Sequence, residues 1–253
     1  MADSEILASR DGGVMEIAFN RPRKKNALTA GMYLAATHAL RDAESDPAVR
    51  VVLFRGEGDS FCAGNDLEDF AANPPVEEGA PVFQFLDAAS RATRPCVAAV
   101  HGSAVGIGTT LLLHCELVYA AADARFAVPF TRLGLVPEFA SSYLLPLVAG
   151  YHRAAELLLL GETFDAAKAD AAGFITRVLP AAEVLPAARE AARSLAALPP
   201  KSVQRTKALM RGAHAAAVQA RMKAEIDEFR PMLFEPAARA ALERFLTKRK
   251  REA

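Results

Sequence analysis

The chain of 253 residues is 52% hydrophobic and 24% charged, which provides enough apolar side chains for a sizeable core. Its 30 basic residues balance its 30 acidic residues, so no overall field would attract nucleic acid or an anionic membrane. The sequence contains no apolar run typical of a membrane span and no basic, then apolar start typical of a secretory signal. We therefore expect a cytoplasmic protein with neither a nucleic-acid nor a membrane partner.

The first half of the chain predicts a hairpin, a helix and then alternating strands and helices. Apolar residues 6–8 and 14–19 flank Asp11-Gly12-Gly13, which favours a tight β-turn. Thr29 stands where an N-cap would, before a helix expected to end near Ser45. Further strands are expected near residues 51–54, 97–100 and 117–120, and helices near residues 81–92 and 107–114. This alternation is typical of an α/β domain with largely parallel strands.

From about Ser141 the sequence favours Ala- and Leu-rich helices. Glycines and prolines should break them, at Gly150, Gly161, Gly173, Pro180 and Pro199-Pro200. Segments near residues 213–229 and 236–248 are amphipathic and suit docking on the body or on a neighbouring subunit. We expect a core over residues 1–195 and a C-terminal helical region over residues 196–253.

Three segments carry candidate chemistry. Phe61-Cys62-Ala63-Gly64-Asn65-Asp66-Leu67 and Gly106-Ile107-Gly108 each follow an apolar strand and could present backbone amides to one pocket. Preorganised N–H groups stabilise the negative charge that develops on an acyl oxygen. Pro137-Glu138 adds a carboxylate that could move a proton. The five histidines show no paired metal-ligand spacing, so no metal site is expected.

These motifs, in this order, resemble the crotonase (enoyl-CoA hydratase/isomerase) superfamily over nearly the whole chain. The matching segments are Asn20-Arg21-Pro22 with Asn26-Ala27-Leu28, residues 61–67, and residues 102–108 with 115–120. The resemblance implies an α/β fold, a crotonase-like spiral of ββα units with a C-terminal helical trimerisation region. It also implies an acyl-CoA substrate, a homotrimer or dimer of trimers, and no cofactor, since coenzyme A is part of the substrate.

The resemblance further implies roles for individual residues. The amides of Asn65 and Ile107 would form an oxyanion hole for the thioester oxygen. The CoA thioester would be bound by Arg23, Lys24, Ala63, Asn65, Asp66, Leu67, Gly106 and Ile107. Phe130, Leu133 and Phe139 would line the acyl pocket.

Two further charged residues have other expected roles. Glu116 begins a predicted strand, and we expect its role to be structural. Lys207 resembles a position that recurs in the family and is a weaker candidate for ligand contact.

The carboxylates favour one subtype of the family. Hydratases of this family hold a water with two glutamates, and their places here are Thr110 and Phe130, neither of which can activate water. Glu138 remains, as in the peroxisomal type of Δ3,Δ2-enoyl-CoA isomerase, although Phe139-Ala140 replaces a smaller, glycine-led pair. An apolar pocket should raise the pKa of Glu138.

We therefore expect Glu138 to carry a proton from C2 to C4 of a 3-enoyl-CoA. Hydration or another acyl-CoA reaction on the same fold, such as thioester hydrolysis, stays open. A non-catalytic acyl-CoA-binding protein is a third alternative.

Overall fold

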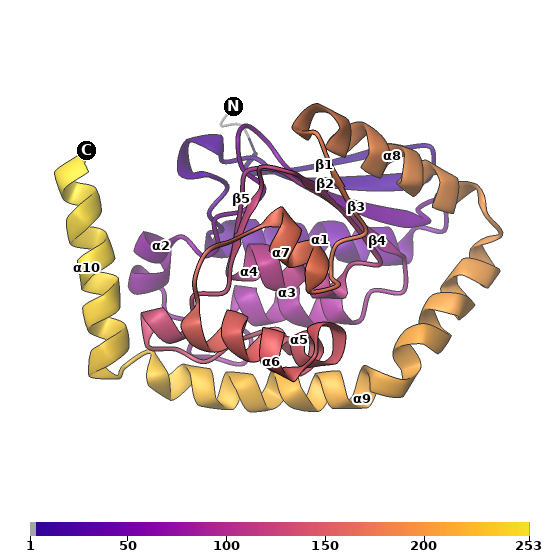
Figure 1. The fold of residues 1–253 in the computed structure, drawn as a ribbon. Coiled ribbons are helices and arrows are strands. Elements are labelled where there is room, and N and C mark those ends of the chain that lie inside the picture. The colour runs from indigo at the N-terminus through magenta and orange to yellow at the C-terminus, as the bar shows by residue number, and fades with distance from the viewer. Residues whose placement is uncertain (1–3, 253) are drawn as a thin grey trace.

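The computed structural model describes residues 4–252, without the side chains of residues 245 and 248–252. Its main sheet has six strands in the order β1-β2-β3-β4-β6-β9 (Figure 1). The strands are β1 (Ile6–Asp11), β2 (Val14–Phe19), β3 (Val51–Gly56), β4 (Cys96–Val100), β6 (Leu117–Ala121) and β9 (Arg177–Leu179). β1 and β2 form the predicted antiparallel hairpin, and every later pair is parallel. The α/β class predicted from the alternating pattern is confirmed.

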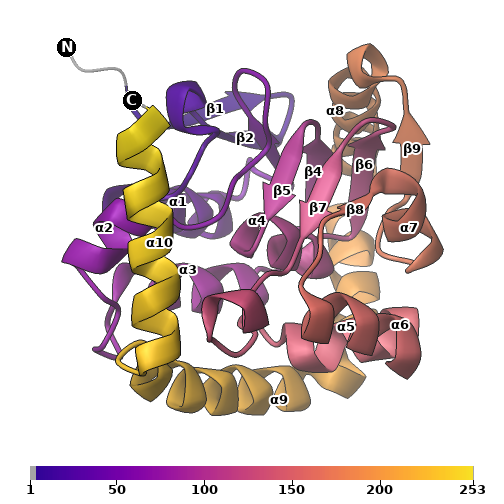
Figure 2. The same ribbon diagram turned by 60° about the vertical axis from the view of Figure 1, so that its left-hand side comes forward.

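A second, small sheet lies beside the first and was missed in the sequence. Its strands are β5 (Ser103–Val105), β7 (Arg125–Ala127) and β8 (Phe164–Asp165). β5 pairs parallel with β7, which pairs antiparallel with β8 (Figure 2). Strands of two or three residues are too short to show a period-2 pattern. Their pairing depends on contacts distant in sequence.

The helices of the first half follow the predicted boundaries closely. Thr29 caps α1 (Ala30–Ser45), because its hydroxyl accepts a bond of 3.2 Å from the Met32 amide. The other regular segments are η1 (Pro22–Lys24), α2 (Leu67–Ala72), α3 (Pro81–Ser90), α4 (Ile107–Thr110), η2 (Leu111–His114) and η3 (Thr131–Leu133). The helix expected over residues 107–114 is therefore one α-helical turn followed by a 3₁₀ turn.

The second half is helical, as expected from residue 141 onward. It comprises α5 (Ser141–Ala149), α6 (Tyr151–Ala155), a π-helical turn η4 (Glu156–Leu160), α7 (Ala166–Ala171), α8 (Ala181–Ala197), α9 (Pro200–Met232) and α10 (Pro236–Glu252). α8 packs on β3, β4 and β6. α9 runs beneath α5 and α6, and α10 turns up beside α2 (Figures 1 and 2).

One boundary in this half was wrong. The segment expected near residues 213–229 is the second part of a single helix of 33 residues. Gly212 interrupts the pattern in the sequence, but it lies inside the helix with open space around its Cα. A single glycine in a helix costs only about 1 kcal/mol, which the packing of a long helix exceeds.

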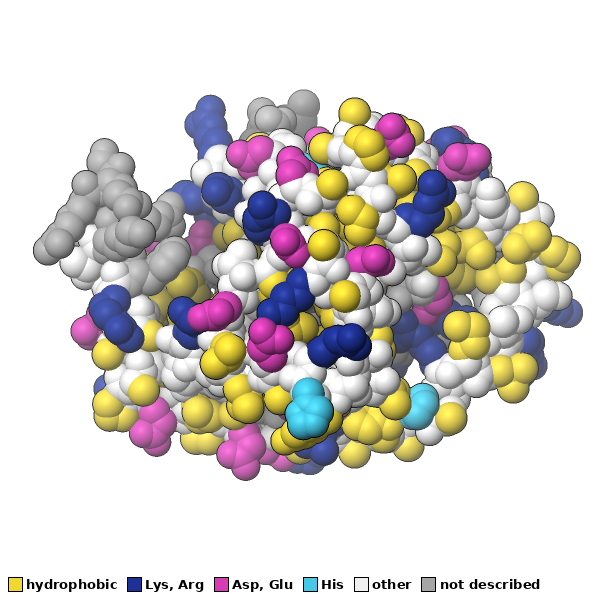
Figure 3. Space-filling view, in the orientation of Figure 1, with side chains coloured by type: hydrophobic (Ala, Val, Ile, Leu, Met, Phe, Trp, Pro, Cys, Tyr) yellow, Lys and Arg dark blue, Asp and Glu magenta, His cyan; other side chains and the backbone are white. Residues whose placement is uncertain are grey.

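The core lies around the main sheet. β3 and β4 are buried on both faces, and Phe19 packs against Phe54 and Phe61. On the face in Figure 3, Lys and Arg side chains alternate with Asp and Glu and form no extended patch of one sign. Among the described helices, none is both long and apolar enough to span a bilayer.

Candidate active site

Two loops that were predicted to supply backbone amides meet in the structure. Cys62 bridges to Ala104, and its carbonyl oxygen accepts a bond of 2.9 Å from the Val105 amide. A side chain at Gly108 would place its Cβ 2.5 Å from the Cys62 carbonyl oxygen, so only glycine fits there. At Gly106 a Cβ would come within 4.0 Å of the Gly64 Cα. The 62–65 turn and the start of α4 are therefore in direct contact.

The amides of Asn65 and Ile107 are left out of the surrounding backbone network. Within the described residues, the neighbouring amides of Ala63 and Asp66 donate to the carbonyl oxygens of Lys25 and Leu28, at 3.0 and 2.8 Å. Ile107 is the first residue of α4, where an N–H group has no acceptor within the helix. Both residues line the same cavity. This arrangement can bind an oxygen that becomes negatively charged.

That cavity has a volume of about 550 Å³, within the range of small-molecule sites. It brings together ten of the residues predicted from the sequence. They are Arg23, Lys24, Ala63, Asn65, Asp66, Leu67, Gly106, Ile107, Phe130 and Leu133. Its basic rim comes from η1 and the residue after it, and its apolar wall includes η3 and Phe229 of α9.

A second cavity of about 450 Å³ adjoins the first, and Asn65, Asp66 and Phe70 line both. Its wall includes Tyr33 of α1, whose hydroxyl donates a hydrogen bond to Asn65 Oδ1. The sequence did not point to Tyr33, because an aromatic residue on the buried side of a helix is indistinguishable from core. Its contact with Asn65 joins residues that are 32 positions apart.

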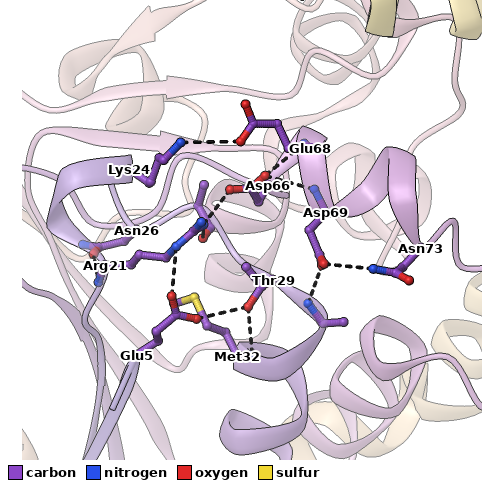
Figure 4. A network of polar contacts seen from close by, with 12 residues as sticks. Glu5, Arg21, Lys24, Asn26, Thr29, Met32, Asp66, Glu68, Asp69 and Asn73 are labelled. Atoms are coloured by element: carbon purple, nitrogen blue, oxygen red, sulfur yellow. Dashed lines mark hydrogen bonds and ion pairs between the residues drawn. The ribbon is translucent and has the colours of Figure 1, made fainter. Parts of the chain in front are cut away.

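Asp66 lies at the cavity wall, but its carboxylate is committed to the protein. One oxygen accepts from the amides of Glu68 and Asp69 at the start of α2, and the other from Arg21 at 2.6 Å (Figure 4). Burial opposes ionisation of Asp66, yet these donors prevail and its pKa lies below the ordinary value. Asp66 therefore stabilises the cavity wall, and its carboxylate charge is already paired within the protein. Of the predicted cations, Lys24 lies 3.5 Å from Glu68, and Arg23 is exposed.

Glu138 does not line either of these cavities, and its side chain is buried. The charge of its side chain acts on Tyr33 and on Cys62. The residues that follow Cys62 in the chain line the larger cavity. Burial, and then the charge of Glu225, raise its pKa to about 8, and the nearby Thr110 hydroxyl opposes this rise. Among the described residues, Glu138 Oε1 and Thr110 Oγ1 have no well-formed hydrogen bond. A carboxyl of this kind can accept and return a proton near neutral pH.

Phe139, which was predicted to line the acyl pocket, does not line either of these two cavities. It is buried and stacks on His114 with ring centroids 3.8 Å apart. His114 Nε2 donates to the Phe139 carbonyl oxygen at 2.8 Å, and burial lowers the pKa of His114 to about 3. Phe139 therefore packs in the core next to Glu138, and its backbone has a φ of 62°.

Lys207 also lies apart from the cavities. Its Nζ donates to the Arg94 carbonyl oxygen at 2.7 Å and lies 3.1 Å from Glu116. Glu116 in turn accepts from the Cys96 amide at 2.8 Å, which confirms its structural role. Lys207 therefore anchors α9 to the sheet.

Comparison with known proteins identifies relatives along most of the chain. The family model for enoyl-CoA hydratase/isomerase matches residues 9–252. Enoyl-CoA delta isomerase 2 of Rattus norvegicus is 41% identical over 212 residues, covering 81% of this chain and 54% of that protein. 1,2-Epoxyphenylacetyl-CoA isomerase of Escherichia coli is 36% identical over 201 residues, 77% of each protein.

The chain spans about half the length of the first curated relatives that it matches. Among solved structures, an enoyl-CoA hydratase/isomerase from Pseudoalteromonas atlantica has a TM-score of 0.92 at 40% identity, covering 97% of this chain and 98% of that one. Other relatives are named as a hydratase and a dehalogenase, so the names do not agree on one reaction.

Proposed function

The chain belongs to the enoyl-CoA hydratase/isomerase family, and on that premise we propose that it converts a 3-enoyl-CoA to the trans-2-enoyl-CoA. The observation that carries the proposal is the buried carboxyl of Glu138, whose charge acts on the buried Cys62 thiol. The places of the two hydratase glutamates hold Thr110 and Phe130, and both side chains are buried. Without those two glutamates, a single proton carrier suits an isomerisation, which needs no water.

In the proposed reaction the Asn65 and Ile107 amides receive the thioester oxygen. They stabilise the dienolate that forms when C2 of a β,γ-unsaturated thioester loses a proton. Loss of one such donor typically raises the barrier by about 3–4 kcal/mol. The adjoining apolar side chains of Phe130 and Leu133 would face the acyl group and keep water from the dienolate.

Glu138 is the proposed proton carrier. Its ionised form takes the proton from C2, and the resulting acid returns the proton to C4 as the double bond moves into conjugation. The same carboxylate is regenerated, so no metal or redox cofactor is required. A pKa of about 8 supports this role, because transfer in both directions is efficient when the pKa is close to the working pH.

We assign the basic rim to the phosphates of coenzyme A. Arg23, Lys24 and Lys25 stand together at the mouth of the larger cavity. Phosphate groups bind cations of this kind through charge-assisted hydrogen bonds.

The proposal includes a homotrimer or a dimer of trimers. Large apolar side chains are exposed on and beside α5, α6 and α9, and such surfaces mark protein contacts. They are Leu147, Val148, Tyr151, Leu159, Leu160, Leu209 and Met210.

The test of the reaction compares wild type with Glu138→Gln on a 3-enoyl-CoA. We expect formation of the 2-enoyl product, and solvent exchange at C2 and C4, to fall at least about a hundredfold in the variant. Binding of a saturated acyl-CoA, measured by calorimetry, should stay unchanged because the CoA contacts remain. Full activity of the variant would remove Glu138 as the base.

The same assays separate the alternatives. Addition of water to a 2-enoyl-CoA by wild type, without isomerisation, would identify a hydratase. Release of free coenzyme A would identify a thioester hydrolase. Tight binding of acyl-CoA with no turnover in either protein would identify a binding protein.

A further inference from the structure

The backbone that follows Glu138 has an unusual conformation. Phe139 and Ala140 have φ values of 62° and 54°, in the left-handed region where residues with a Cβ are strained. The left-handed conformation brings the Cβ of such a residue too close to a carbonyl oxygen and is unfavourable. This is where the family resemblance led us to expect a glycine-led pair. Other contacts must therefore hold the turn that carries Glu138.

Glu225, from the middle of α9, supplies those contacts. One of its carboxylate oxygens accepts from the Ala140 amide at 2.6 Å. The other accepts from the Ser142 amide at 3.0 Å and from the Ser142 hydroxyl at 2.5 Å. Ala140 stands at the N-cap of α5 and has no side chain that could cap it, so Glu225 acts as the cap from 85 residues away.

The same turn is tied to Glu138 from within. Ser141 donates from both its amide and its hydroxyl to the Glu138 carbonyl oxygen, at 3.0 and 2.6 Å. Glu225 therefore orders the residues on either side of Ser141, and Ser141 binds the backbone of Glu138. Figure 1 shows α9 passing beneath α5, which brings this distant carboxylate to the turn.

The two carboxyls also interact through their charges. The charge of Glu225 is the second cause, after burial, of the raised pKa of Glu138. Burial raises the pKa of Glu225 to about 7, while its bonds from Ser142 and Ala140 and the charge of Arg221 oppose this rise. The other groups that face Glu138 are Thr110 of α4, Tyr33 of α1 and Cys62. A negative charge on Glu225 therefore makes Glu138 harder to ionise.

We propose that Glu225 is the positioning residue for the Glu138 base, because its carboxylate holds the strained turn that aims Glu138. The proposal rests on the proposed function in so far as Glu138 is the base. The contacts of Glu225 are independent of which reaction that base serves.

The first test is the pH profile of kcat/KM in Glu225→Gln. The glutamine amide keeps one acceptor oxygen but places an NH₂ group against a backbone donor, so the turn loosens. We expect kcat to fall about ten- to a hundredfold with little change in KM. Loss of the negative charge of Glu225 makes Glu138 easier to ionise. The acid limb of the pH profile of kcat/KM should therefore move to lower pH by at least about half a unit.

Glu228→Gln is the matched control, since Glu228 is an exposed glutamate on the same helix. It should leave both kcat and the profile unchanged. A fall in stability with kcat and the pH profile unchanged would show a merely structural role for Glu225 and would overturn the proposal.

The second test does not depend on turnover or on the folding of Glu225→Gln. Carboxyl ¹³C resonances of labelled glutamates report the ionisation of Glu138 and Glu225 directly. Coupling between two sites is reciprocal, so Glu138→Gln should lower the titration midpoint of Glu225. No change in that midpoint would show that the Glu225 carboxylate does not lie beside Glu138, and it would overturn the positioning role.

These readouts keep the two proposals apart. If wild type fails to isomerise any 3-enoyl-CoA but the midpoint of Glu225 moves in Glu138→Gln, the proposed reaction fails and the positioning role stands. If isomerisation depends on Glu138 but kcat is unchanged in Glu225→Gln and the midpoint stays fixed, the reaction stands and the positioning role fails.

Discussion

At the scale of single residues, the site depends on neighbours that hold its groups in place. Asn65 is held on one side by its backbone and on the other by the Tyr33 hydroxyl. Glu138 is held through Ser141 and, as proposed, through Glu225. Burial also changes the acidity of these groups, since it raises the pKa of both Glu138 and Tyr33.

Removal of the Tyr33 hydroxyl tests this support of Asn65. In Tyr33→Phe the Asn65 side chain loses a buried donor, so we expect a loss of about 1 kcal/mol in the free energy of unfolding. The amide of Asn65 should also be less well ordered, and kcat should fall several-fold with KM nearly constant. Urea unfolding and steady-state kinetics would measure both. Wild-type kcat in the variant would show that Asn65 needs no support from Tyr33.

At the scale of elements, short helices and loops are joined by shared polar groups. Asp66 caps α2 and pairs with Arg21, which also pairs with Glu5 at 3.0 Å (Figure 4). Asp69 accepts from the Ala30 amide at 2.7 Å and so joins α2 to the start of α1. These bonds position the wall between the two cavities.

Asp66→Ala should destabilise the protein by about 1–3 kcal/mol at pH 7, because it removes a cap and leaves Arg21 without one partner. The pKa of Asp66 is lowered in the folded state, so its contribution exists above its unfolded pKa and is lost as the pH falls through its folded pKa. The stability gap between wild type and variant should therefore shrink below about pH 4.

Asp66→Asn is the matched control for this prediction. Asparagine caps a helix about as well as aspartate but carries no charge. It should recover the capping part of the stability without the pH dependence. A gap that is constant from pH 7 to pH 3 would contradict the assigned role of the ion pair.

At the scale of the whole molecule, α9 closes the site from below. Lys207 anchors its first half at Arg94 and Glu116, and Gln219 bonds to Arg91 and Ser90 at the end of α3. Glu225 then contacts the turn after Glu138, and Phe229 lines the larger cavity. A helix that is far from the motifs in sequence therefore contributes to the site at several points.

Lys207→Met tests the anchor. The substitution removes the ion pair of Glu116 with Lys207 and leaves its ion pair with Arg211. It also removes the hydrogen bond from Lys207 to the Arg94 carbonyl oxygen. We expect a loss of about 1–3 kcal/mol in the free energy of unfolding, measured by urea denaturation. The control Lys201→Met changes an exposed lysine at the start of the same helix and should stay within about 0.5 kcal/mol of wild type. Equal stability of Lys207→Met and wild type would show that the anchor is dispensable.

Much of this protein was determined by local sequence. The hairpin at Gly12-Gly13, the Thr29 cap, the glycine breaks and the main-sheet strands other than β9 were predicted, because turn chemistry and periodicity act within a few residues. The turns at Gly64, Gly106 and Gly108 could also be predicted, since these glycines meet a local need for close backbone approach. The roles of Asn65, Ile107 and Glu138 in catalysis stay predictions.

Only the tertiary structure decided what surrounds those groups. The short strands β5, β7 and β8 and the unbroken α9 depend on partners far along the chain. Phe139 was assigned to the pocket from its position beside Glu138, but it packs in the core and stacks on His114. Tyr33 and Glu225 had no sequence signal, because their contacts cross 32 and 85 residues. The pKa of Glu138 likewise follows from burial and from a second carboxyl, which arise only when distant segments pack together.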